Sequence, residues 1–442
     1  MKKIDLLIKN GLILTYDKNP EISSIAVNSG KIIEIDKIDK LEKKYAPSQT
    51  IDAEDKIVMP GFVNTHTHAG MIYFKGMADD LPLMDWLSNH IWPAESHFLK
   101  KEFMKDAALH GCAEMIKNGI TTFNDMYFFG NEVAESAEKV GIRAVLGEVV
   151  LDTSVANCST ADEIFSYTKM MHSKYKDSEL IDVAVAPHAI YTVSKENLIK
   201  SAELAEKLGV TLHIHISETH QEVEDCIQKT GKRPVEYLDS IGFFRSPVLT
   251  AHAIWLDENE HNILAKHGAS IAINTSSNLK LASGFDSFAS YLKKGINLSI
   301  GTDGVASNNN LSLLEEISLT SKLQKALNND PTILPAKQMI EIATLGGTKA
   351  LLKDKEIGSI EIGKKADLLL IETNSLEAQP MYNPFSHLVY TFTSESIKDV
   401  IINGKIVMKN RKLTTLDEAE LLDKAKFYQK KIIAFNKKNH TS

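Results

Sequence analysis

The sequence predicts an α/β fold: a TIM-type (β/α)8 barrel that carries a small composite β-sandwich domain built from both chain ends. Two observations predict it. The middle of the chain alternates short apolar runs with amphipathic stretches, and the alternation repeats eight times. Such repeats predict a parallel sheet that closes into a barrel. Strand-rich segments with similar turn signals occupy both ends of the chain, and chain termini often lie close together in space.

The barrel is expected between residues 59 and 356. Its apolar runs have the length of buried parallel strands. Between them, residues 195–209 and 287–295 have apolar positions at helical spacing and end in glycine, a common helix stop signal. The eight runs are PGFVNTH, GITTFND, RAVLGEVVL, DVAVAPH, VTLHIHIS, PVLTAH, ASIAINT and NLSIGTD.

The two chain ends are expected to form one sheet domain, with residues 1–58 as its first part and residues 357–442 as its second. Two independent flaps are the alternative. The periodic, lysine-rich stretch from Asp417 to Asn436 predicts a C-terminal helix packed on the outside. Turn signals in these segments are Asn10-Gly11, Ser29-Gly30 and Asn403-Gly404.

Bulk properties favour a cytoplasmic protein that acts on small molecules. The formal net charge of the 442 residues is −8 and no basic cluster stands out, which argues against nucleic acid as a partner. No apolar run approaches the roughly 20 residues of a membrane helix. The start MKKIDLLIKNGLIL is interrupted by polar residues and lacks a cleavage site, so it is interpreted as a strand. The cysteines Cys112, Cys158 and Cys226 form no CxxC pair, as expected in a reducing compartment.

Histidines and carboxylates recur where the predicted strands end. In a (β/α)8 barrel, these positions all lie on the face where the βα loops build active sites. This coincidence is the strongest functional signal in the residues themselves. The residues are His66 and His68 at the first run, His188 at the fourth, His215 and Glu218 at the fifth, His252 at the sixth and Asp303 at the eighth.

His66 and His68 form the sharpest pair. Residues i and i+2 of a strand point the same way, so both imidazoles can enter one coordination sphere. An HxH pair alone is more often a packed or surface pair, but His215 and Asp303 are predicted on the same rim. Three imidazoles and one carboxylate suit zinc and leave room for a water. Iron(II), manganese and nickel are compatible with the same ligand types.

The segment from His213 to Glu218 requires a choice between two histidines. Both share a face of a regular strand, but His215 lies nearer the active end and is the better ligand. His213 is expected deeper in the barrel, in a structural role. Glu218 follows on the loop, from which it would reach the activated water as a proton shuttle. A lone glutamate there would more often be a solvated loop carboxylate.

Asp303 and His252 have both a catalytic and a structural interpretation. A carboxylate beside a bound metal can ligate it, accept a proton, or do both, whereas an aspartate in GTDG is also a common turn or helix N-cap residue. His252 would hydrogen-bond the attacking hydroxide or a developing charge; alone, it would more often be a packed core histidine. Metal-activated water attacking an electrophilic carbon fits this set, but spacing alone does not separate deamination from amide or ester hydrolysis.

Five sequence segments resemble the amidohydrolase superfamily, and within it the methylthioadenosine/S-adenosylhomocysteine deaminase branch, which overlaps with chlorohydrolase-like enzymes. The resemblance runs nearly end to end and includes the strand-rich ends. It implies hydrolysis of a 5′-substituted adenosine to the inosine analogue and ammonia, and a homo-oligomeric assembly. The segments are PGFVNTHTH, HIHISETH, AHAIWL, NTSSNLKLASG and GTDGVASNNNLSLLEE.

The resemblance also implies roles for individual residues. One divalent metal, normally zinc, would be held by His66, His68, His215 and Asp303. Hydroxide on this metal would attack C6, with Glu218 and Asp303 moving protons and also contacting the substrate, and His252 steadying the hydroxide. Glu95 would bind the ribose hydroxyls and His188 would also bind substrate. Trp86 and Trp92 are candidates for the pocket wall, although core packing is the commoner role of tryptophan.

The sequence departs from the family pattern after the third barrel strand. Family members that bind the amino-acid tail of S-adenosylhomocysteine use arginines there. In this chain Arg143 lies on the strand itself, and Gly147 and Glu148 stand where a basic residue is expected. Methylthioadenosine, 5′-deoxyadenosine and adenosine are therefore favoured over S-adenosylhomocysteine.

Other functions remain open at this point. Aminofutalosine deaminase, guanine or cytosine deaminase and triazine hydrolase are alternatives within the superfamily. Glu95 discriminates, because a free base has no ribose diol to bind. A catalytically inactive barrel used for binding is a further alternative, which the intact set of His66, His68, His215, Glu218, His252 and Asp303 argues against.

Overall fold

The structure is a computed structural model that describes residues 1–439, and eight parallel strands within this range form the predicted barrel. Neighbouring strands pair in chain order, and the last lies beside the first: the Asp303 amide donates to the His66 carbonyl oxygen at 2.9 Å, and Thr65 Oγ1 donates to the Ile300 carbonyl oxygen at 2.9 Å. The strands are β6 (Phe62–Thr67), β7 (Ile120–Tyr127), β8 (Arg143–Val150), β9 (Ile181–Pro187), β10 (Leu212–Ile216), β11 (Val248–His252), β12 (Ser270–Ile273) and β13 (Asn297–Ile300). Each overlaps a predicted apolar run, although β6, β7 and β9 extend one or two residues beyond theirs, and the fold class is confirmed.

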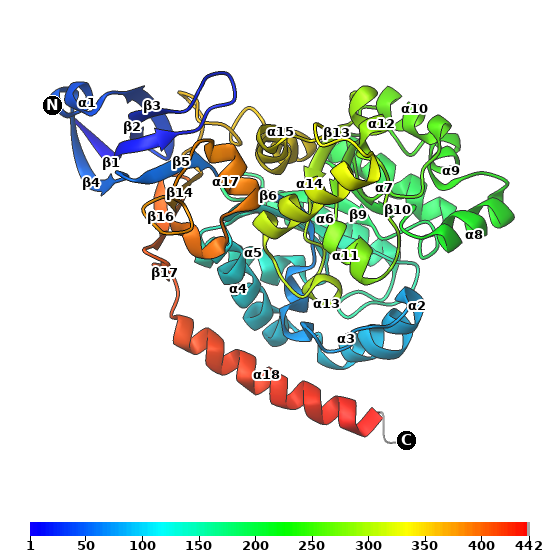
Figure 1. The fold of residues 1–442 in the computed structure, drawn as a ribbon. Helices are drawn as coiled ribbons and strands as arrows, with labels where there is room; N and C mark the ends of the chain where they lie inside the picture. The colour runs from blue at the N-terminus through cyan, green and yellow to red at the C-terminus, as the bar shows by residue number, and fades with distance from the viewer. Residues whose placement is uncertain (440–442) are drawn as a thin grey trace.

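Helices surround this barrel on the outside (Figure 1). Several end as their sequences predict; for example, α7 stops at Leu208 because Gly209 adopts a left-handed φ of 68°. The helices are α4 (Lys101–Lys117), α5 (Gly130–Val140), α6 (Ala161–Tyr175), α7 (Lys195–Leu208), α8 (His220–Thr230), α9 (Pro234–Ser240), α10 (Glu258–Lys266), α12 (Phe288–Lys293), α14 (Leu313–Leu327), α15 (Ala336–Glu341) and α16 (Gly347–Ala350), with the π-turn η3 (Ile342–Gly346) between the last two.

Three connections after barrel strands contain short helical segments of their own. Because they follow strand ends, they lie at the face where the predicted site residues gather. The first connection holds η1 (Ala69–Phe74), α2 (Leu83–Asp85), η2 (Trp86–Ile91) and α3 (Trp92–Phe98); the others hold α11 (Thr275–Lys280) and α13 (Val305–Asn308).

The two chain ends join in one mixed sheet, which nine strands of the described chain build. Its central seam is an antiparallel pairing of β5 with β14, in register from Lys56 opposite Glu372 to Pro60 opposite Leu368. This pairing rules out two independent flaps. The strands are β1 (Lys2–Ile13), β2 (Glu21–Asn28), β3 (Lys31–Asp36), β4 (Tyr45–Asp52), β5 (Lys56–Pro60), β14 (Leu368–Glu372), β15 (Ile397–Ile402), β16 (Lys405–Lys409) and β17 (Lys412–Leu413). The helix α1 (Ile38–Lys44) packs beside β1, β2 and β4, whereas α17 (Pro384–Tyr390) contacts α14 and α15 of the barrel and η4 (Ser394–Ser396) precedes β15. The domain limits at residues 58/59 and 356/357 stay a proposal.

One of the predicted turns of this sheet is wrong. Ser29-Gly30 and Asn403-Gly404 have positive φ and connect paired strands, as expected. Asn10-Gly11 instead lies inside the continuous strand β1, where the register with β2 shifts as in a β-bulge. Glycine is required there because a Cβ at Gly11 would lie 2.4 Å from Val58 Cγ2 of the neighbouring β5. The Asn-Gly signal therefore marks a close approach of two strands.

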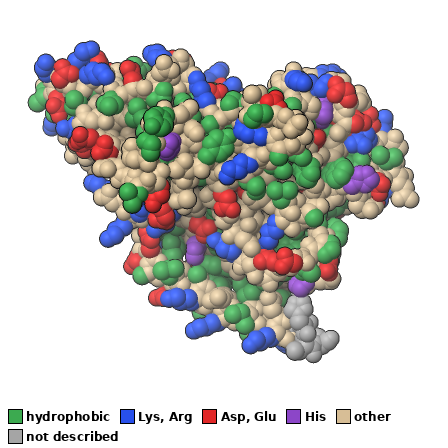
Figure 2. Space-filling model, in the orientation of Figure 1, with side chains coloured by type: hydrophobic (Ala, Val, Ile, Leu, Met, Phe, Trp, Pro, Cys, Tyr) green, Lys and Arg blue, Asp and Glu red, His purple; other side chains and the backbone are tan. Residues whose placement is uncertain are grey.

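The predicted C-terminal helix is α18 (Glu418–Asn439), which runs along the outside of the barrel (Figure 1). It is held where Tyr428 Oη and Lys424 Nζ lie 2.9 and 3.1 Å from Asp106 Oδ2 of α4. The Tyr428 ring stacks on Tyr73 at 4.8 Å between centroids. None of the described helices combines the length and apolar character that crossing a membrane requires. On the face shown in Figure 2, basic and acidic side chains are interspersed.

A buried ion pair connects the barrel to the terminal sheet. Arg143, the first residue of β8, lies with Nε 3.0 Å from Asp367 Oδ2 and with Nη2 3.3 Å from Asp367 Oδ1. Asp367 also accepts the Asn403 amide at 2.7 Å, and Arg143 donates to the Glu179 carbonyl. Arg143 thus lies at the start of a barrel strand, opposite the face that carries the predicted site. Its charge is used in packing the two parts of the chain together.

Candidate metal-dependent active site

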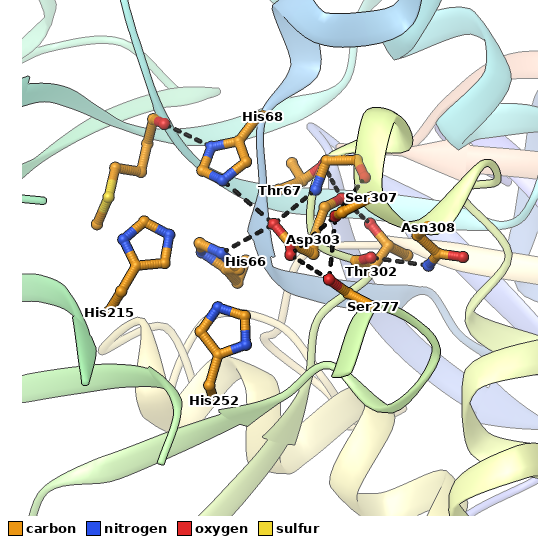
Figure 3. A network of polar contacts seen from close by, with 12 residues as sticks. His66, Thr67, His68, His215, His252, Ser277, Thr302, Asp303, Ser307 and Asn308 are labelled. Atoms are coloured by element: carbon orange, nitrogen blue, oxygen red, sulfur yellow. Dashed lines mark hydrogen bonds and ion pairs between the residues drawn. The ribbon is translucent and has the colours of Figure 1, made fainter. Parts of the chain in front are cut away.

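The carboxylate of Asp303 lies between two imidazoles at the end of the barrel. Asp303 Oδ1 is 3.3 Å from His66 Nε2 and 3.2 Å from His68 Nε2 (Figure 3). His66 is on β6, His68 follows it directly and Asp303 follows β13, so the closure of the barrel brings residues 235 positions apart into contact. Burial opposes ionisation of Asp303, but the contacts with both histidines outweigh it and hold the pKa of this carboxyl well below its usual range.

His215 and His252 complete the cluster from β10 and β11. The His215 ring centroid is 4.8 Å from that of His66 and 5.6 Å from that of His68. The His252 ring lies 5.5 Å from that of His215. Among the described residues, two sets have ligand atoms close enough to share one metal ion: His66, His68 and Asp303, and His66, His215 and His252. The four expected ligands are therefore together, and His252 adds a further nitrogen.

Backbone carbonyls orient two of these imidazoles. His68 Nδ1 lies 2.6 Å from the Met126 carbonyl oxygen, and His215 Nδ1 lies 2.9 Å from the His188 carbonyl oxygen. A carbonyl only accepts, so each Nδ1 carries the proton and each Nε2 presents a lone pair to the cluster. Metal-ligating histidines are commonly held in this way by a hydrogen bond at the other ring nitrogen.

One buried atom of the cluster has no hydrogen-bond partner. His66 Nε2 is inaccessible to solvent and makes no hydrogen bond, although Asp303 Oδ1 is 3.3 Å away. Burial lowers the pKa of His66 to about 4, so this ring is neutral at pH 7. An unpaired buried nitrogen is costly. A divalent cation between nitrogen and carboxylate would satisfy both, so the donor set fits a metal ion.

Asp303 is held in a strained backbone conformation. Its φ is 61°, which is uncommon for a residue other than glycine. Ser277 Oγ and Ser307 Oγ lie 2.6 and 3.0 Å from Asp303 Oδ2, and the Gly304 amide donates to Oδ1 at 2.7 Å. Positive φ values recur at Ser217 and His252. Such strain costs free energy and is concentrated at functional sites.

Glu218 faces His252 across the cluster. Its Oε2 is 3.7 Å from His252 Nε2, and its Oε1 accepts a hydrogen bond from Ser283 Oγ at 3.1 Å. Burial raises the pKa of Glu218, with a further contribution from the Asp303 charge. A carboxyl group whose pKa is raised toward neutrality is suited to donate and accept protons.

Glu95 lies on α3, in the connection that follows the first barrel strand. Its Oε1 accepts a hydrogen bond from Tyr127 Oη at 2.5 Å. Burial raises the pKa of Glu95 to about 7, while the Tyr127 hydroxyl and the charge of His68 oppose the rise. The Tyr127 ring centroid lies 5.9 Å from that of His68, so Tyr127 connects Glu95 to the cluster.

Both the imidazole and the backbone carbonyl of His188 lie beside His215 of the cluster. Its Nδ1 lies 2.8 Å from Thr192 Oγ1, whose own proton is donated to the Ala189 carbonyl oxygen. The Nδ1 of His188 is therefore the donor and Nε2 is free to accept. Burial lowers the pKa of His188 to about 3, and its ring centroid lies 4.8 Å from that of His215. Of the expected wall residues, Trp86 is buried in the core and Trp92 is 41% exposed.

His213 lies deeper in the barrel, as expected from the strand direction. Its Nε2 is 3.1 Å from His66 Nδ1, and its Nδ1 is 2.8 Å from Asn124 Nδ2. It therefore supports the His66 ring from behind the cluster.

Arg143 and Glu148 lie where the sequence departs from the family pattern, and neither places a positive charge at the active-site face of the barrel. Arg143 pairs with Asp367 at the other end of its strand. Glu148 accepts the amides of Phe129 and Gly130 at 3.1 and 2.8 Å and the Asn157 side chain at 2.8 Å. Burial raises the pKa of Glu148 to about 7. These contacts occupy the Glu148 carboxylate in holding the start of α5.

Several residues around the cluster were not predicted from the sequence. Tyr127 ends β7 two residues beyond the predicted apolar run, so the rule that selected the histidines did not reach it. Glu222, in the first turn of α8, accepts the amides of Ser217 and Glu218 at 2.8 and 2.9 Å. The spacing of Thr219 and Glu222 marks a helix start but does not indicate these two contacts. Ser277, Asn278 and Ser283 lie in the NTSSNLKLASG segment, which was noticed only for its resemblance.

Known proteins resemble this chain over nearly its whole length. The family model described as the amidohydrolase family matches residues 57–407. The chain is 46% identical over 431 residues to the 5-methylthioadenosine/S-adenosylhomocysteine deaminase of Thermodesulfovibrio yellowstonii, covering 96% of this chain and 98% of that protein. It is 41% identical to the 5′-deoxyadenosine deaminase of Methanococcoides burtonii, covering 96% of each. The crystal structure of a zinc-bound adenosine deaminase from Xanthomonas campestris superposes with a TM-score of 0.95 at 38% identity, covering 98% of this chain and 99% of that one.

Proposed function

The chain belongs to the amidohydrolase family, and we propose that it hydrolyses the 6-amino group of 5′-substituted adenosines, which yields the inosine analogue and ammonia. The observation that carries this proposal is the Asp303 carboxylate held 3.3 and 3.2 Å from His66 and His68, with Glu218 and His252 facing each other beside it. The names of the relatives, which are deaminases of adenine nucleosides, support the same reaction.

The proposed metal ligands are His66, His68, His215 and Asp303, and the proposed metal is zinc. When bound there, a divalent metal lowers the pKa of water and so supplies a nucleophile at neutral pH. The imidazole and carboxylate donor set and the unpaired His66 Nε2 support this assignment. The zinc-bound relative of known structure supports the choice of metal.

The remaining steps use groups of the chain itself. Asp303, whose pKa is held low, accepts the proton of the attacking water. Glu218 donates a proton to the purine ring nitrogen next to C6 and then takes back the remaining proton of the newly added hydroxyl group. Asp303 passes the proton it accepted to the departing amino group, so that ammonia leaves and both carboxyl groups return to their starting state. His252 Nε2 orients the water for attack at C6. The raised pKa of Glu218 supports its role as the proton carrier.

For substrate binding, we propose that Glu95 accepts hydrogen bonds from the ribose 2′- and 3′-hydroxyls. Tyr127 occupies Glu95 Oε1, which leaves Oε2 and the second lone pair of Oε1 for the sugar. His188 Nε2, a free acceptor, would bind a further polar group of the nucleoside. A free base lacks the diol, so guanine and cytosine deamination are less supported than nucleoside deamination, as is triazine hydrolysis.

The preferred 5′-substituent is proposed to be uncharged. Methylthioadenosine, 5′-deoxyadenosine and adenosine carry no carboxylate, whereas S-adenosylhomocysteine does. Arg143 and Glu148, the residues at the point where a basic group is expected, are engaged elsewhere or acidic. An unneutralised carboxylate in a binding site is costly, so the order of preference should follow the charge of the tail.

A cytosolic location and a homo-oligomeric assembly complete the proposal. Cys112, Cys158 and Cys226 are all buried free thiols, in keeping with a reducing compartment. Sedimentation equilibrium of the purified protein would establish the assembly.

The deciding experiment is an ammonia-release assay on metal-reconstituted protein. Adenosine, methylthioadenosine, 5′-deoxyadenosine, S-adenosylhomocysteine, aminofutalosine, guanine and cytosine would be compared at equal concentration. Turnover of the uncharged adenosines, with S-adenosylhomocysteine slower, is the expected result. Turnover of free bases alone would overturn the substrate class.

A further inference from the structure

Three side chains of one loop segment each hydrogen-bond a different group of the proposed reaction. The segment is residues 275–283, which comprise α11 and the turn after it, and it is called the support segment below. Ser277 Oγ lies 2.6 Å from Asp303 Oδ2, Asn278 Oδ1 lies 2.8 Å from His252 Nδ1, and Ser283 Oγ lies 3.1 Å from Glu218 Oε1. Ser277, Asn278 and Ser283 are all buried.

The contact with Asn278 determines which nitrogen of His252 is free. The His252 ring nitrogen donates to the amide oxygen, so Nδ1 carries the proton and Nε2 keeps its lone pair. His252 Nε2 is the atom that faces Glu218 Oε2, at 3.7 Å. Without an acceptor at Nδ1, the imidazole would lose both its orientation and the preference for this tautomer.

The contacts with Ser277 and Ser283 divide each carboxylate into an anchored and a working oxygen. Ser277 binds Asp303 Oδ2 together with Ser307, while Oδ1, which also accepts the Gly304 amide, faces His66 and His68. In the same way Ser283 binds Glu218 Oε1, while Oε2 faces His252. The anchored oxygen cannot rotate into the place of the working oxygen without breaking a buried hydrogen bond.

The support segment is itself fixed to the rest of the molecule. The Thr275 hydroxyl contacts the Thr320 hydroxyl of α14 at 2.6 Å, and the Ser276 amide donates to Glu316 Oε2 at 3.1 Å. At the other end, Trp255 Nε1 donates to the Ser283 carbonyl oxygen at 2.7 Å. These contacts point away from the reacting groups, so the segment forms a bridge from α14 and Trp255 to the cluster.

We propose that the support segment is a positioning element that sets Asp303, His252 and Glu218 in their reactive orientations through Ser277, Asn278 and Ser283. The inference rests on the proposed function for the identity of the reacting groups. It assigns a role in turnover to residues that ligate nothing and accept no proton from the substrate. Second-layer contacts of this kind are typically worth about 10- to 100-fold in activity or metal affinity.

The central test replaces Asn278 by leucine and by aspartate. Asn278→Leu removes the acceptor at similar volume, so we expect kcat for methylthioadenosine to fall about 10- to 100-fold with KM little changed. Asn278→Asp restores an acceptor at the same place and is expected to recover most of the lost kcat. Ser283→Ala is expected to lower kcat without changing the bound metal content, measured by inductively coupled plasma mass spectrometry.

Thr373→Val is the matched control, because it removes one hydrogen bond of a buried threonine hydroxyl, to the Asp55 carbonyl oxygen, within the terminal sheet. It is expected to lower Tm but to leave kcat and metal content unchanged. If Asn278→Leu and Thr373→Val reduce kcat equally, or if Asn278→Asp is no better than Asn278→Leu, the segment is merely structural and the proposal is overturned.

A metal-binding measurement separates this proposal from the proposed function. Ser277→Ala removes the shorter of the two hydroxyl contacts of Asp303 Oδ2 and leaves only that of Ser307. It is expected to weaken zinc binding about tenfold relative to Thr373→Val, in titrations that need no substrate. If the unchanged protein deaminates no nucleoside, the proposed function fails. The support role then stands if Ser277→Ala weakens zinc binding and falls if it does not.

Discussion

Arg143 and Asp303 are both buried charged residues of the same barrel, but they lie at its opposite ends and differ in how completely the polar atoms around them are paired. Arg143, at the start of β8, pairs with Asp367 and has partners for its guanidinium nitrogens. Asp303, after β13, faces the His66 Nε2 atom that has no hydrogen-bond partner, and its backbone is strained at a φ of 61°. The first arrangement is complete without a ligand, whereas a cation would satisfy the second.

In this molecule, a buried charge whose partners are complete stabilises the fold, whereas buried ionisable groups with incomplete partners gather at the proposed active site. Burial alone would lower the pKa of Arg143, but the charge and hydrogen bonds of Asp367 raise it, so the pair stays ionised and holds the barrel to the terminal sheet. At the other end, burial lowers the pKa of His66 and raises the pKa of Glu218 and of Glu95. Each shift favours the neutral form of the group. Groups that are buried but not fully satisfied are those expected to act on a substrate.

The largest effect is expected at Glu218. Glu218→Gln keeps the size and the contact with Ser283 but removes the proton carrier, so kcat should fall by at least about 10²- to 10⁴-fold. Bound metal and Tm should be unchanged. Steady-state kinetics with methylthioadenosine would measure the loss, and Glu224→Gln, which changes an exposed carboxylate of the following helix α8, is the control. Near-normal turnover would remove Glu218 from the mechanism.

Arg143→Met should produce the opposite pattern. It leaves Asp367 buried without its partner, so the free energy of unfolding should fall by about 3–5 kcal/mol, measured by urea denaturation. The kcat of the folded protein should not change. The double variant Arg143→Met with Asp367→Leu should recover part of the stability. A loss of kcat without a loss of stability would place Arg143 in the active site.

Glu95→Ala should weaken nucleoside binding by about 10- to 100-fold in KM, because charge-assisted hydrogen bonds contribute about 1.5–3 kcal/mol. Any activity on free bases should be unaffected, since they have no diol. Parallel kinetics on adenosine and guanine would measure both. An equal loss on the two substrates would mean that Glu95 supports the fold of its connection.

Glu222→Ala should lower kcat by about tenfold, because it removes the acceptor that holds the Ser217 and Glu218 amides in place. It also leaves two buried N–H groups unpaired, which costs roughly 1–3 kcal/mol each. Glu222→Gln retains one acceptor oxygen and should be intermediate in kcat. If Glu222→Ala lowers Tm but leaves kcat unchanged, the Glu222 carboxylate serves only to stabilise the turn before α8.

The smallest effect concerns pH. The pKa of Glu95 lies at about 7 in the protein, and the ionised form accepts hydrogen bonds from the diol better, so kcat/KM for nucleosides should rise as the pH increases through about 7. The Tyr127 hydroxyl lowers this pKa, so Tyr127→Phe should move the rise to higher pH. Tyr175→Phe, which removes a tyrosine hydroxyl that contacts Asn131 at the end of α6, should not move it. A profile unchanged in Tyr127→Phe would contradict the pairing.

The sequence by itself determined the barrel and the cluster at its active end. Strand–helix alternation and glycine helix stops are local signals that can be recognised in the sequence. Because the strand ends of a parallel barrel necessarily meet on one face, His66, His68, His215 and Asp303 could be grouped from the sequence alone. The turn predicted at Asn10-Gly11 was wrong because a β-bulge and a tight turn both favour residues that tolerate a positive φ. Only the neighbouring strand β5, which approaches Gly11 closely, distinguishes the two.

Tertiary structure alone decided which side chains complete the cluster. The support segment lies up to 65 positions from the groups it contacts, and Tyr127 lies 32 positions from Glu95. Asp367 was not predicted as the partner of Arg143, because it lies 224 positions away and beyond the barrel. Hydrogen bonds between such residues depend on distances of a few tenths of an ångström, which follow from packing the whole barrel and not from any periodicity along the chain.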